Sequence, residues 1–547
     1  MRTNPNMINY ETTYASFKKD VPEYYNFSAQ IIDKWAENPE KLAMLWVDDN
    51  GNEVRKTFSE ISQSSQQAAN ALSNLGIKKG DKILLMISRQ ITWWEVMTAC
   101  IRMGVVAIPV VTMLPAKDIQ FRINQAKACC VIAEPQVTLL VDSLIDKCPS
   151  IKHRIVVDEP CEDWLFYNDI VSSAPKRFET AKTMSGDISL IYFTSSTEGA
   201  TKMVMHTHAS SAIAHKVTGK YWLDLGEDDL HWNISDTGWA KSAWSSYFGP
   251  WHMGAAIFIH HTATIDPLKI LNNLATYPIS TLCATPTIYR MMVLQNLTSY
   301  KFPHLRHCVG AGEPLTSEII EIWKNDTGCT IQNGYGQTET GLLAASYPCL
   351  KEHLGALGKP VPGVELAIIN ENNEILPPET EGTIAVKIEP QKPMGFFAGY
   401  GKEEEEESLH YVNGWYLTGD RAYMDKDGYI WFVGRMDDVI TSSGYRINPL
   451  EVEQTLMNHP AVFEAAVISS PNETYGQIAK AFVVLEGGYN PSEELVKELQ
   501  EHVKSSLVPH KFPRAIKFVS ELPKTFSGKL RRVDLRQAEW RSNENSH

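Results

Sequence analysis

A loop rich in small polar residues follows the strand-like run Ile191–Phe193 and ends at a lysine. It reads TSSTEGATK from Thr194 to Lys202. Backbone N–H groups and hydroxyls in such a loop can hold phosphate oxygens, and the lysine ammonium adds a positive point charge. The spacing GxxxxGK[ST] of a P-loop is absent, which disfavours an ordinary kinase or GTPase. The loop therefore indicates a phosphate site of another kind.

A carboxylate that suits a hard cation lies in a second stretch, NGYGQTETG from Asn333 to Gly341. Glu339 stands there between two threonines in a turn flanked by glycines. Mg²⁺ in proteins is commonly held by one or two carboxylates together with substrate phosphates. We therefore take Glu339 as a candidate magnesium ligand.

Two further stretches of the sequence, near the C-terminal end, join the phosphate loop and the Glu339 stretch in the comparison with a known family. One runs from Trp415 to Glu453 and contains MDKDGYIWFVGR, which predicts a β-hairpin because an Asp-Gly pair separates strand-like runs. The other is PKTFSGKLRR, from Pro523 to Arg532. Taken together and in this order, the four stretches resemble the adenylate-forming superfamily of acyl-CoA synthetases, luciferases and adenylation domains. They are most similar to the medium-chain acyl-CoA synthetases, over nearly the whole chain.

The resemblance implies a ligase of fatty acid metabolism. Such an enzyme joins a carboxylic acid, here a medium-chain or branched fatty acid, to coenzyme A through an acyl-adenylate, with ATP and Mg²⁺, and releases AMP and pyrophosphate. It implies ATP contacts at Thr194, Ser195, Ser196, Thr197, Glu198, Gly199, Ala200, Thr201, Lys202, Gly312, Glu313, Pro314, Asn333, Gly334, Tyr335, Gly336, Gln337, Thr338, Asp420, Arg435 and Lys529.

Lys529, Lys202 and Glu339 are the catalytic residues that the resemblance implies, with Glu339 as the metal ligand. Asp420 matches the carboxylate that accepts from both ribose hydroxyls, a task for an acceptor-only group. Arg435 matches a contact to ribose and phosphate, which its fixed fork of donors can bridge. Lys529 matches the lysine that bridges the α-phosphate and the carboxylate during adenylation.

Coenzyme A contacts are implied for a loop of the C-terminal domain. In the family this domain turns about a hinge that matches Asp437 and brings forward the segment SSGYRI. The matching residues are Ser443, Gly444, Tyr445 and Arg446. Domain motions absorbed by a few hinge residues are a known way to separate two chemical steps.

The acyl pocket is implied to include Trp239, Gly336 and Thr338. In relatives restricted to acetate a bulky tryptophan stands just before the QTET motif and closes the pocket, whereas this chain has Gly336. We therefore expect a pocket for acids larger than acetate. The aromatic stretch Ser235–Trp251 suits an apolar tail.

The phosphate loop departs from the family pattern TSGTTGxPK at Ser196, Glu198 and Thr201. A side chain in place of glycine costs about 1–2 kcal/mol where φ is positive, and Glu198 adds negative charge near pyrophosphate. Tyr475 stands where relatives often carry arginine. Two alternatives therefore stay open: an adenylating enzyme without CoA transfer, and a nucleotide or acyl-adenylate binder with impaired catalysis.

The elements that must position these residues follow an α/β pattern. From Lys82 to Glu159 short apolar runs alternate with amphipathic ones, and similar strand-like runs at Ala256–His260 and Ile279–Ala284 indicate a second layer. Beyond Asp438 a compact unit of helices and strands follows. We predict an α/β protein with a large domain of α/β layers and a distorted barrel, residues 1–436, and a small mobile α+β domain, residues 437–547.

Composition limits the partners and the location. A net charge of -14 argues against non-specific nucleic acid binding, and the apolar run Met103–Leu114 is too short to span a membrane. The first twenty residues resemble neither a secretory signal nor a transit peptide, and the nine cysteines are scattered. These features predict an unprocessed cytoplasmic protein. The oligomeric state is left open, with a homodimer as one option.

Overall fold

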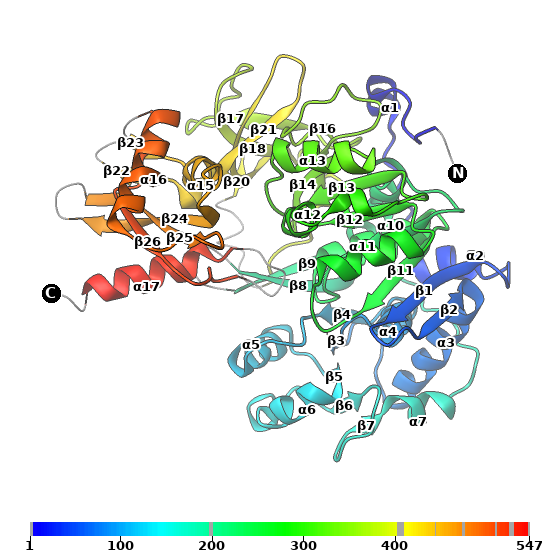
Figure 1. Ribbon diagram of the computed structural model, residues 1–547. Helices are drawn as coiled ribbons and strands as arrows, with labels where there is room; N and C mark the ends of the chain where they lie inside the picture. The colour runs from blue at the N-terminus through cyan, green and yellow to red at the C-terminus, as the bar shows by residue number, and fades with distance from the viewer. Residues whose placement is uncertain are drawn as a thin grey trace. The chain divides into compact units, whose positions relative to one another are not determined.

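Residues 4–195, 201–401, 410–442, 445–472, 476–508, 511–524 and 530–544 are described by a computed structural model (Figure 1). The chain divides into two compact units. The first comprises most of the residues up to Glu365 together with Lys387–His410, and the second comprises Leu366–Val386 and Tyr411–His547. Among the described residues, no helix is both long and apolar enough to cross a lipid bilayer.

One sheet of the first unit contains the strands predicted after Lys82. Its strand order is β7-β6-β5-β3-β4-β8-β9, with parallel neighbours except for the antiparallel pair β8 and β9. The short central strands are fully buried, as expected for parallel strands covered on both faces. The bounds are β3 Lys82–Met86, β4 Val106–Pro109, β5 Cys130–Ala133, β6 His153–Val156, β7 Leu165–Phe166, β8 Ile188–Ser195 and β9 Thr201–Thr207.

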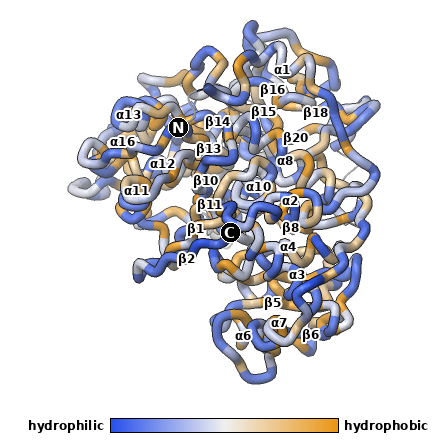
Figure 2. The backbone as a smooth tube through the Cα atoms, turned by 90° about the vertical axis from the view of Figure 1, so that its right-hand side faces the viewer, coloured by the Kyte–Doolittle hydropathy of each residue, from blue (hydrophilic) through white to orange (hydrophobic). Residues whose placement is uncertain are grey.

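A second sheet of the same unit has the order β16-β15-β14-β13-β12-β10-β11-β1-β2. Its hydrophilic edge strand β2 carries charged side chains, which discourage pairing with another chain (Figure 2). The bounds are β1 Leu42–Asp48, β2 Glu53–Thr57, β10 Leu230–Asn233, β11 Ala256–His261, β12 Thr281–Ala284, β13 His307–Ala311, β14 Ile331–Gln337, β15 Gly341–Ala345 and β16 Lys359–Pro360.

The helices of the first unit connect and cover these strands. Helix α3 begins with a capping box between Thr57 and Glu60, and helix α4 ends at Gly104, which adopts a left-handed conformation. The helices are α1 Tyr10–Ser16, α2 Asp33–Trp35, α3 Phe58–Asn74, α4 Ile91–Met103, α5 Ala116–Ala126, α6 Pro135–Asp142, α7 Tyr167–Ser172, α8 Ala214–Val217, α9 Ala240–Ala243, α10 Gly249–His252, α11 Pro267–Thr276, α12 Pro286–Val293 and α13 Ser317–Thr327.

Short 3-10 and π-helical turns interrupt these helices. The π-helical turns are η1 Ser28–Ile32, η3 Ala209–Ile213, η4 Thr218–Trp222 and η5 Trp244–Phe248. The 3-10 turns of this unit are η2 Ile145–Lys147 and η6 Leu297–Ser299.

A hydrophobic core joins the two sheets of the first unit. It includes Met44 and Ile257 from one sheet, Leu85 from the other, and Trp93 and Trp251 from helices α4 and α10. Helix α4 is apolar around most of its surface because it is buried in this core. Its tryptophans therefore pack, as their helical spacing predicts.

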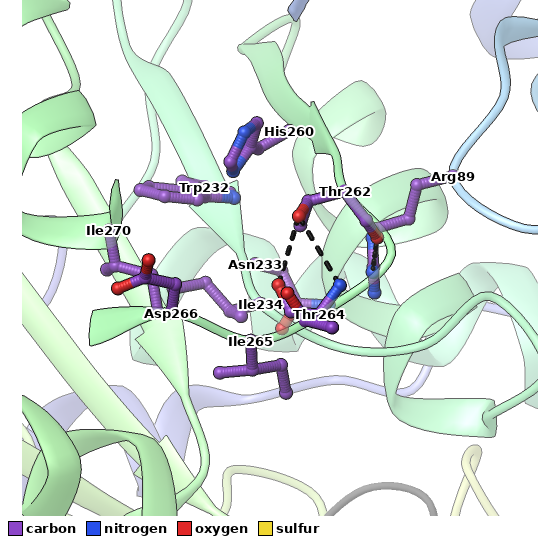
Figure 3. Close-up of a pocket in the computed structure, with 10 residues that line it drawn as sticks. All are labelled: Arg89, Trp232, Asn233, Ile234, His260, Thr262, Thr264, Ile265, Asp266 and Ile270. Atoms are coloured by element: carbon purple, nitrogen blue, oxygen red, sulfur yellow. Dashed lines mark hydrogen bonds between the residues drawn. The ribbon is translucent and has the colours of Figure 1, made fainter. Parts of the chain in front are cut away.

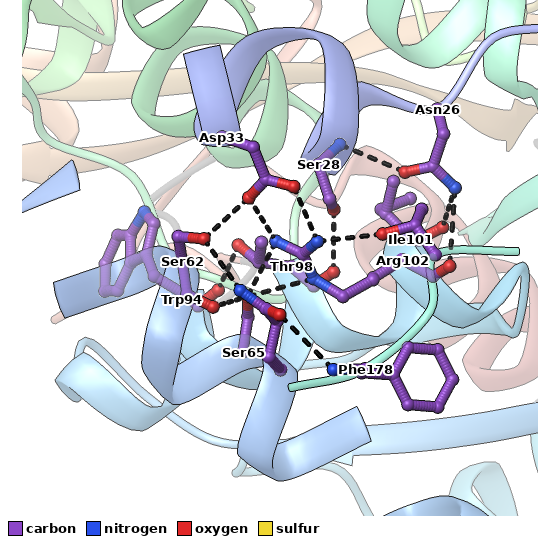
Figure 4. A network of polar contacts seen from close by, with 12 residues as sticks. Asn26, Ser28, Asp33, Ser62, Ser65, Trp94, Thr98, Ile101, Arg102 and Phe178 are labelled. Atoms are coloured by element: carbon purple, nitrogen blue, oxygen red, sulfur yellow. Dashed lines mark hydrogen bonds and ion pairs between the residues drawn. The ribbon is translucent and has the colours of Figure 1, made fainter. Parts of the chain in front are cut away.

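An ion pair with a buried guanidinium lies in the same unit. The Arg102 guanidinium of α4 is 1% exposed and donates to both carboxylate oxygens of Asp33, at 2.8 and 2.7 Å (Figure 4). Ser62 of α3 donates to the same carboxylate at 2.6 Å, and the Thr180 hydroxyl accepts from Arg102 at 2.9 Å. The pair therefore ties α2, α3 and α4 together.

The second unit contains the predicted hairpin and the C-terminal elements. One sheet has the order β17-β18-β20-β19, with β21 paired to β20, and another has the order β24-β25-β26. The hairpin turn lies at Asp425–Gly428, where the Gly428 N–H donates to the Asp425 carbonyl oxygen at 3.0 Å. Helix α15 begins at a proline after Asn448, whose side chain caps it.

The bounds in the second unit are β17 Leu366–Ile369, β18 Gly382–Lys387, β19 Tyr411–Val412, β20 Trp415–Met424, β21 Ile430–Arg435, η7 Met436–Asp438, β22 Ile440–Ser442, β23 Tyr445–Ile447, α15 Pro449–Met457, β24 Val462–Asn472, β25 Gly476–Leu485, α16 Glu493–Ser506, β26 Ala515–Phe518 and α17 Arg532–Glu544. From β22 onward these elements form the unit of helices and strands that the sequence predicts beyond Asp438.

The predicted α/β class is confirmed, with a large unit of mixed sheets and helices and a smaller unit that carries the C-terminal part. Asp437, the predicted hinge, lies in η7 inside the second unit. The boundary at residues 436 and 437, the distorted barrel and the mobility of the smaller domain stay predictions.

Candidate functional site

The hairpin of β8 and β9 carries the lysine of the predicted phosphate loop. Thr194 pairs with Lys202 and Ser195 pairs with Thr201. Ser196, Thr197, Glu198, Gly199 and Ala200 lie outside the described residues. Because strand side chains alternate between faces, Lys202, Val204 and His206 share one face of β9. The Lys202 ammonium and the buried His206 imidazole therefore lie on the same face of the strand.

Glu339 and Lys202 are connected by one tyrosine, Tyr400, which contacts both side chains. The buried Tyr400 hydroxyl donates to Glu339 Oε1 at 3.0 Å, and Lys202 Nζ lies 5.1 Å from the centroid of the Tyr400 ring. The second contact has the geometry of a cation–π interaction. The predicted phosphate lysine and the predicted metal ligand thus contact the same side chain.

Two long-range contacts hold this group in place. The segment before Tyr400 pairs with β9, where the Met205 N–H donates to the Gly399 carbonyl oxygen at 3.0 Å. The Phe397 N–H donates to the Glu339 carbonyl oxygen at 2.8 Å. The backbone of residues 397–399 therefore bridges the β9 strand and the Glu339 turn.

His206 fixes the residue before Glu339. Its Nε2–H donates to the Thr338 carbonyl oxygen at 2.7 Å, because a carbonyl can only accept, and Nδ1 pairs with the Ser210 hydroxyl at 3.0 Å. Burial lowers the pKa of His206 to about 4, so the imidazole is neutral near pH 7. It therefore orients the loop without adding charge.

The ATP contacts that the family resemblance implies on the adenine side, Gly312–Pro314 and Asn333–Thr338, come from adjacent strand ends. Strands β13 and β14 are parallel, and Ala311 at the end of β13 pairs with Gly334 of β14. Gly312, the residue after Ala311, therefore lies beside the segment Asn333–Thr338. Gly312 has φ +107°, a conformation that glycine adopts readily. Glu313 accepts a hydrogen bond from the Thr287 hydroxyl at 2.6 Å, and Pro314 follows it toward α13. Asn333 is buried, and its side-chain amide donates to the Ala356 carbonyl oxygen at 3.1 Å.

Gly336, predicted to open the acyl pocket, is also constrained by its backbone. It pairs with Leu342 next to an irregularity in the β14 and β15 ladder, and Tyr335 and Gln337 flank it on β14. A Cβ at position 336 would lie 1.9 Å from the Gly341 carbonyl oxygen. The close approach of the two strands alone therefore requires glycine here.

Gly336→Ala should destabilise the protein by about 1–3 kcal/mol, because β15 must move to admit the methyl group. The measurement is the midpoint of thermal unfolding. Gly186→Ala is the matched control, since a Cβ there has no atom within 4 Å. Equal midpoints for the two variants would show that β15 shifts at no cost.

Trp239, the other predicted wall of the acyl pocket, precedes α9 and is half-buried. Two residues later, Lys241 is half-buried and donates from Nζ to the Ala311 carbonyl oxygen at 3.0 Å. Burial lowers the pKa of Lys241. Lys241 thus links the helix after Trp239 to the end of β13, where the predicted adenine segment begins.

Asp420 and Arg435 lie together in the second unit. They are paired positions on β20 and β21, and Arg435 Nε lies 4.0 Å from Asp420 Oδ1. The carboxylate is buried, whereas the guanidinium is more exposed. Ser443, Gly444 and Lys529 lie outside the described residues. Tyr445 and Arg446 belong to β23, and Asp437 belongs to η7.

A small pocket elsewhere in the first unit is lined by residues near the ends of β10 and β11, with Arg89 (Figure 3). The Arg89 guanidinium donates to the Thr262 carbonyl oxygen at 2.8 Å, and His260 pairs with Asp49 at 3.1 Å. None of its lining residues is among the predicted site residues. In the described part of the chain, no three His, Cys, Asp or Glu side chains form a metal-binding group.

Tyr400 and His206 are the residues of this site that sequence reasoning missed. The alternation of β9 indicates that His206 faces inward with Val204, so the signal for His206 was present. Tyr400 has no such signal, because its contact with Glu339 depends on pairing between distant segments.

Comparisons with known proteins identify the family of the chain. The family model described as "AMP-binding enzyme" matches residues 32–400, and that described as "AMP-binding enzyme C-terminal domain" matches residues 451–529. Human acyl-coenzyme A synthetase ACSM3, mitochondrial, is 44% identical over 99% of this chain and 94% of its own length. Human acyl-coenzyme A synthetase ACSM4, mitochondrial, is 43% identical over 96% and 92%.

Solved structures are similar over almost the entire fold. The anthranilate CoA ligase AuaEII in complex with anthranoyl-AMP has a TM-score of 0.86 at 27% identity, covering 96% of this chain and 99% of its own. The Brucella canis acyl-CoA synthetase has a TM-score of 0.75 at 29% identity, covering 99% and 100%.

The predicted cytoplasmic location is wrong. The relatives that match nearly full-length are named as mitochondrial proteins, and this finding overturns the cytoplasmic prediction. Scattered free cysteines distinguish reducing from oxidising compartments, but they do not distinguish one reducing compartment from another.

Proposed function

The chain belongs to the AMP-binding enzyme family, and we propose that it is an ATP-dependent acyl-CoA synthetase, an AMP-forming acid–thiol ligase. It converts a carboxylic acid, ATP and coenzyme A into acyl-CoA, AMP and pyrophosphate. The observation that carries this proposal is the group formed by Lys202, Tyr400 and Glu339. A lysine and a carboxylate contact the same tyrosine there, and these are the residue types that could bind phosphate and a metal ion during adenylation, which supports the proposal.

The first step joins the acid to AMP. A carboxylate oxygen attacks the α-phosphorus of ATP, the bond between the α- and β-phosphates breaks, and pyrophosphate leaves. Because a carboxylate is a poor electrophile, this step supplies the leaving group that the thiol later displaces. Positioning and neutralisation of the developing charge therefore dominate, and no side-chain nucleophile is required.

Lys202 and the loop from Thr194 hold the β- and γ-phosphates in this proposal. The segments Gly312–Pro314 and Asn333–Thr338 hold adenine and the α-phosphate. Asp420 accepts from the ribose hydroxyls, Arg435 contacts ribose and phosphate, and Lys529 bridges the α-phosphate and the carboxylate. The adjacency of β13 and β14 and the pairing of Asp420 with Arg435 support these assignments.

Mg²⁺ fits the group around Glu339. The donor is one half-buried carboxylate oriented by the Tyr400 hydroxyl, and such a lone carboxylate suits an ion whose remaining ligands are phosphate oxygens and waters. When bound, Mg²⁺ neutralises phosphate charge. Glu339 and Tyr400 would hold it in place.

In the second step the coenzyme A thiol attacks the acyl carbon of the adenylate, AMP leaves, and the thiol proton is released. We assign Ser443, Gly444, Tyr445 and Arg446 to coenzyme A, with rotation of the small domain about Asp437 between the steps. The acid is a medium-chain or branched fatty acid, held by Trp239, Gly336 and Thr338.

Tyr400→Phe should lower adenylation activity at limiting Mg²⁺ about tenfold or more, because a partner that orients a metal ligand typically contributes that much. The measurement is pyrophosphate release against Mg²⁺ concentration at fixed ATP. Tyr347→Phe is the matched control, a buried tyrosine of the same unit whose hydroxyl has no hydrogen-bond partner among the described residues. An unchanged Mg²⁺ dependence in Tyr400→Phe would remove Tyr400 from the metal site.

The proposed function is tested by pyrophosphate release over a panel of acids, with and without coenzyme A. Release that depends on the acid, together with thioester formation, is the expected result. Release without thioester would instead favour an adenylating enzyme without CoA transfer. No release despite intact ATP binding would favour a catalytically impaired binder. The reason to consider this alternative is that the phosphate loop differs from the family pattern at Ser196, Glu198 and Thr201.

A further inference from the structure

Two buried ring nitrogens beneath the Glu339 turn lack a hydrogen-bond partner among the described residues. They are His215 Nε2 of α8 and Trp244 Nε1 at the start of η5. The His215 side chain is 2% exposed. The two rings stack with centroids 4.9 Å apart and planes inclined by 20°. They form one unit, which we call the His215–Trp244 pair.

The pair lies against the proposed acyl site. His206, which donates to the Thr338 carbonyl oxygen, packs edge-on against Trp244 with ring centroids 5.9 Å apart. His215 Cε1 lies 3.7 Å from the place where a Cβ on Gly341 would be. Trp244 follows α9, the helix that begins directly after Trp239. The pair is therefore linked to Thr338 through His206, and it follows the proposed wall residue Trp239 by one helical turn.

The local backbone supports a role in binding. The helices that carry the pair contain the π-helical turns η3, η4 and η5, which directly adjoin α8 and α9. Such turns are rare in proteins and occur most often at functional sites, where they change the direction of side chains. Of the four π-helical turns among the described residues, three therefore adjoin the helices that carry the pair.

Energetics indicate that the pair needs a polar partner. A buried donor or acceptor without one costs about 1–3 kcal/mol. The Trp244 ring can only donate. Burial lowers the pKa of His215 well below its ordinary value, so this imidazole is neutral, and its Nδ1 pairs with the Thr218 hydroxyl at 3.2 Å. The Thr218 hydroxyl can donate to Nδ1 or accept from it, so Nε2 either accepts or donates, according to the tautomer.

A hydroxyl group satisfies both nitrogens at once. It can accept from the Trp244 N–H and either donate to His215 Nε2 or accept from it, so it suits both tautomers, whereas a carbonyl oxygen suits only the tautomer that carries the proton on Nε2. We propose that the His215–Trp244 pair is the polar end of the acyl pocket and that the preferred acid carries a hydroxyl on its tail. This inference rests on the proposed acyl-CoA synthetase function and names its substrate class.

The test compares kcat/KM for matched acids. Hexanoate, octanoate and decanoate are each paired with the acid of the same length that carries a terminal hydroxyl, and thioester formation is measured. At one of these lengths the hydroxy acid should be favoured about tenfold or more, the factor that corresponds to about 1.4 kcal/mol, within the range for one satisfied buried group.

His215→Leu and Trp244→Phe should bring that ratio to about one, because each removes one nitrogen and keeps an apolar or aromatic body in place. His231→Leu is the matched control, a buried neutral histidine on β10 that pairs with Thr281 at 2.6 Å. It should leave the ratio unchanged. Since each ratio is internal to one variant, a general loss of stability does not affect it.

Three results would overturn the inference. A ratio at or below one at every length in the native enzyme would mean that the pair holds a water molecule. A ratio that survives both substitutions would place hydroxyl recognition elsewhere. Thioester formation with none of the acids would count against the proposed function itself, and this inference would fail with it.

Discussion

Lys529→Ala should reduce adenylation by roughly a hundred- to a thousandfold while sparing thioester formation from supplied acyl-adenylate. A preorganised charge that meets developing negative charge typically contributes about 2.7–4 kcal/mol to the transition state. In the proposed mechanism Lys529 contacts the α-phosphate and the carboxylate only in the first step. The two half-reactions are measured separately, as pyrophosphate release and as acyl-CoA formation from the adenylate.

Lys524→Ala is the matched control for this variant. Lys524 belongs to the same segment and pairs with Glu464 at 2.7 Å near the surface, where an ion pair contributes little. The residues on either side of 525–529 are held together, since Lys524 and Leu530 form a β-bridge and the Arg531 N–H donates to the Pro523 carbonyl oxygen at 2.8 Å. Equal loss of both half-reactions in Lys529→Ala would show that its role is wrongly assigned.

Asp33→Ala should destabilise the first unit by about 3–5 kcal/mol, because it leaves the Arg102 guanidinium buried without its carboxylate. Arg102 is 1% exposed, whereas the Asp33 side chain is 34% exposed. Arg102→Met should therefore cost less, since water can still reach the carboxylate that remains. The midpoint of urea unfolding, followed by tryptophan fluorescence, measures both changes.

The double variant Asp33→Ala/Arg102→Met separates the charge effect from lost packing. It should be more stable than Asp33→Ala alone, because the unpaired buried charge is gone. Glu352→Ala is the control, as its pair with Lys324 is exposed on both sides and should be worth at most about 1 kcal/mol. A double variant no more stable than Asp33→Ala would mean that hydrogen bonding and packing outweigh the buried charge.

Local patterns predicted the elements of this fold well. The strands β3 to β6 and the helices between them lie where the alternation of apolar and amphipathic runs places them. The hairpin of β20 and β21 turns at its Asp-Gly pair. Such features depend on neighbours within a few residues, and the chain carries that information in every segment.

Gly336 shows where such reasoning is incomplete. The sequence suggests a pocket opened by the absence of a side chain, yet the approach of β15 already excludes any Cβ there. Both reasons can hold, but only the structure reveals the second. The mitochondrial relatives likewise corrected a location that composition could not determine.

By itself, the sequence determined the α/β class, the order of helices and strands, and the family, together with the residue types that could bind phosphate and metal. Only the tertiary structure decided which of them meet. Tyr400 joins Lys202 to Glu339, and His215 stacks on Trp244 beneath the same turn, through pairings between segments far apart in the chain. Such contacts leave no local periodicity, because the packing of whole elements sets them.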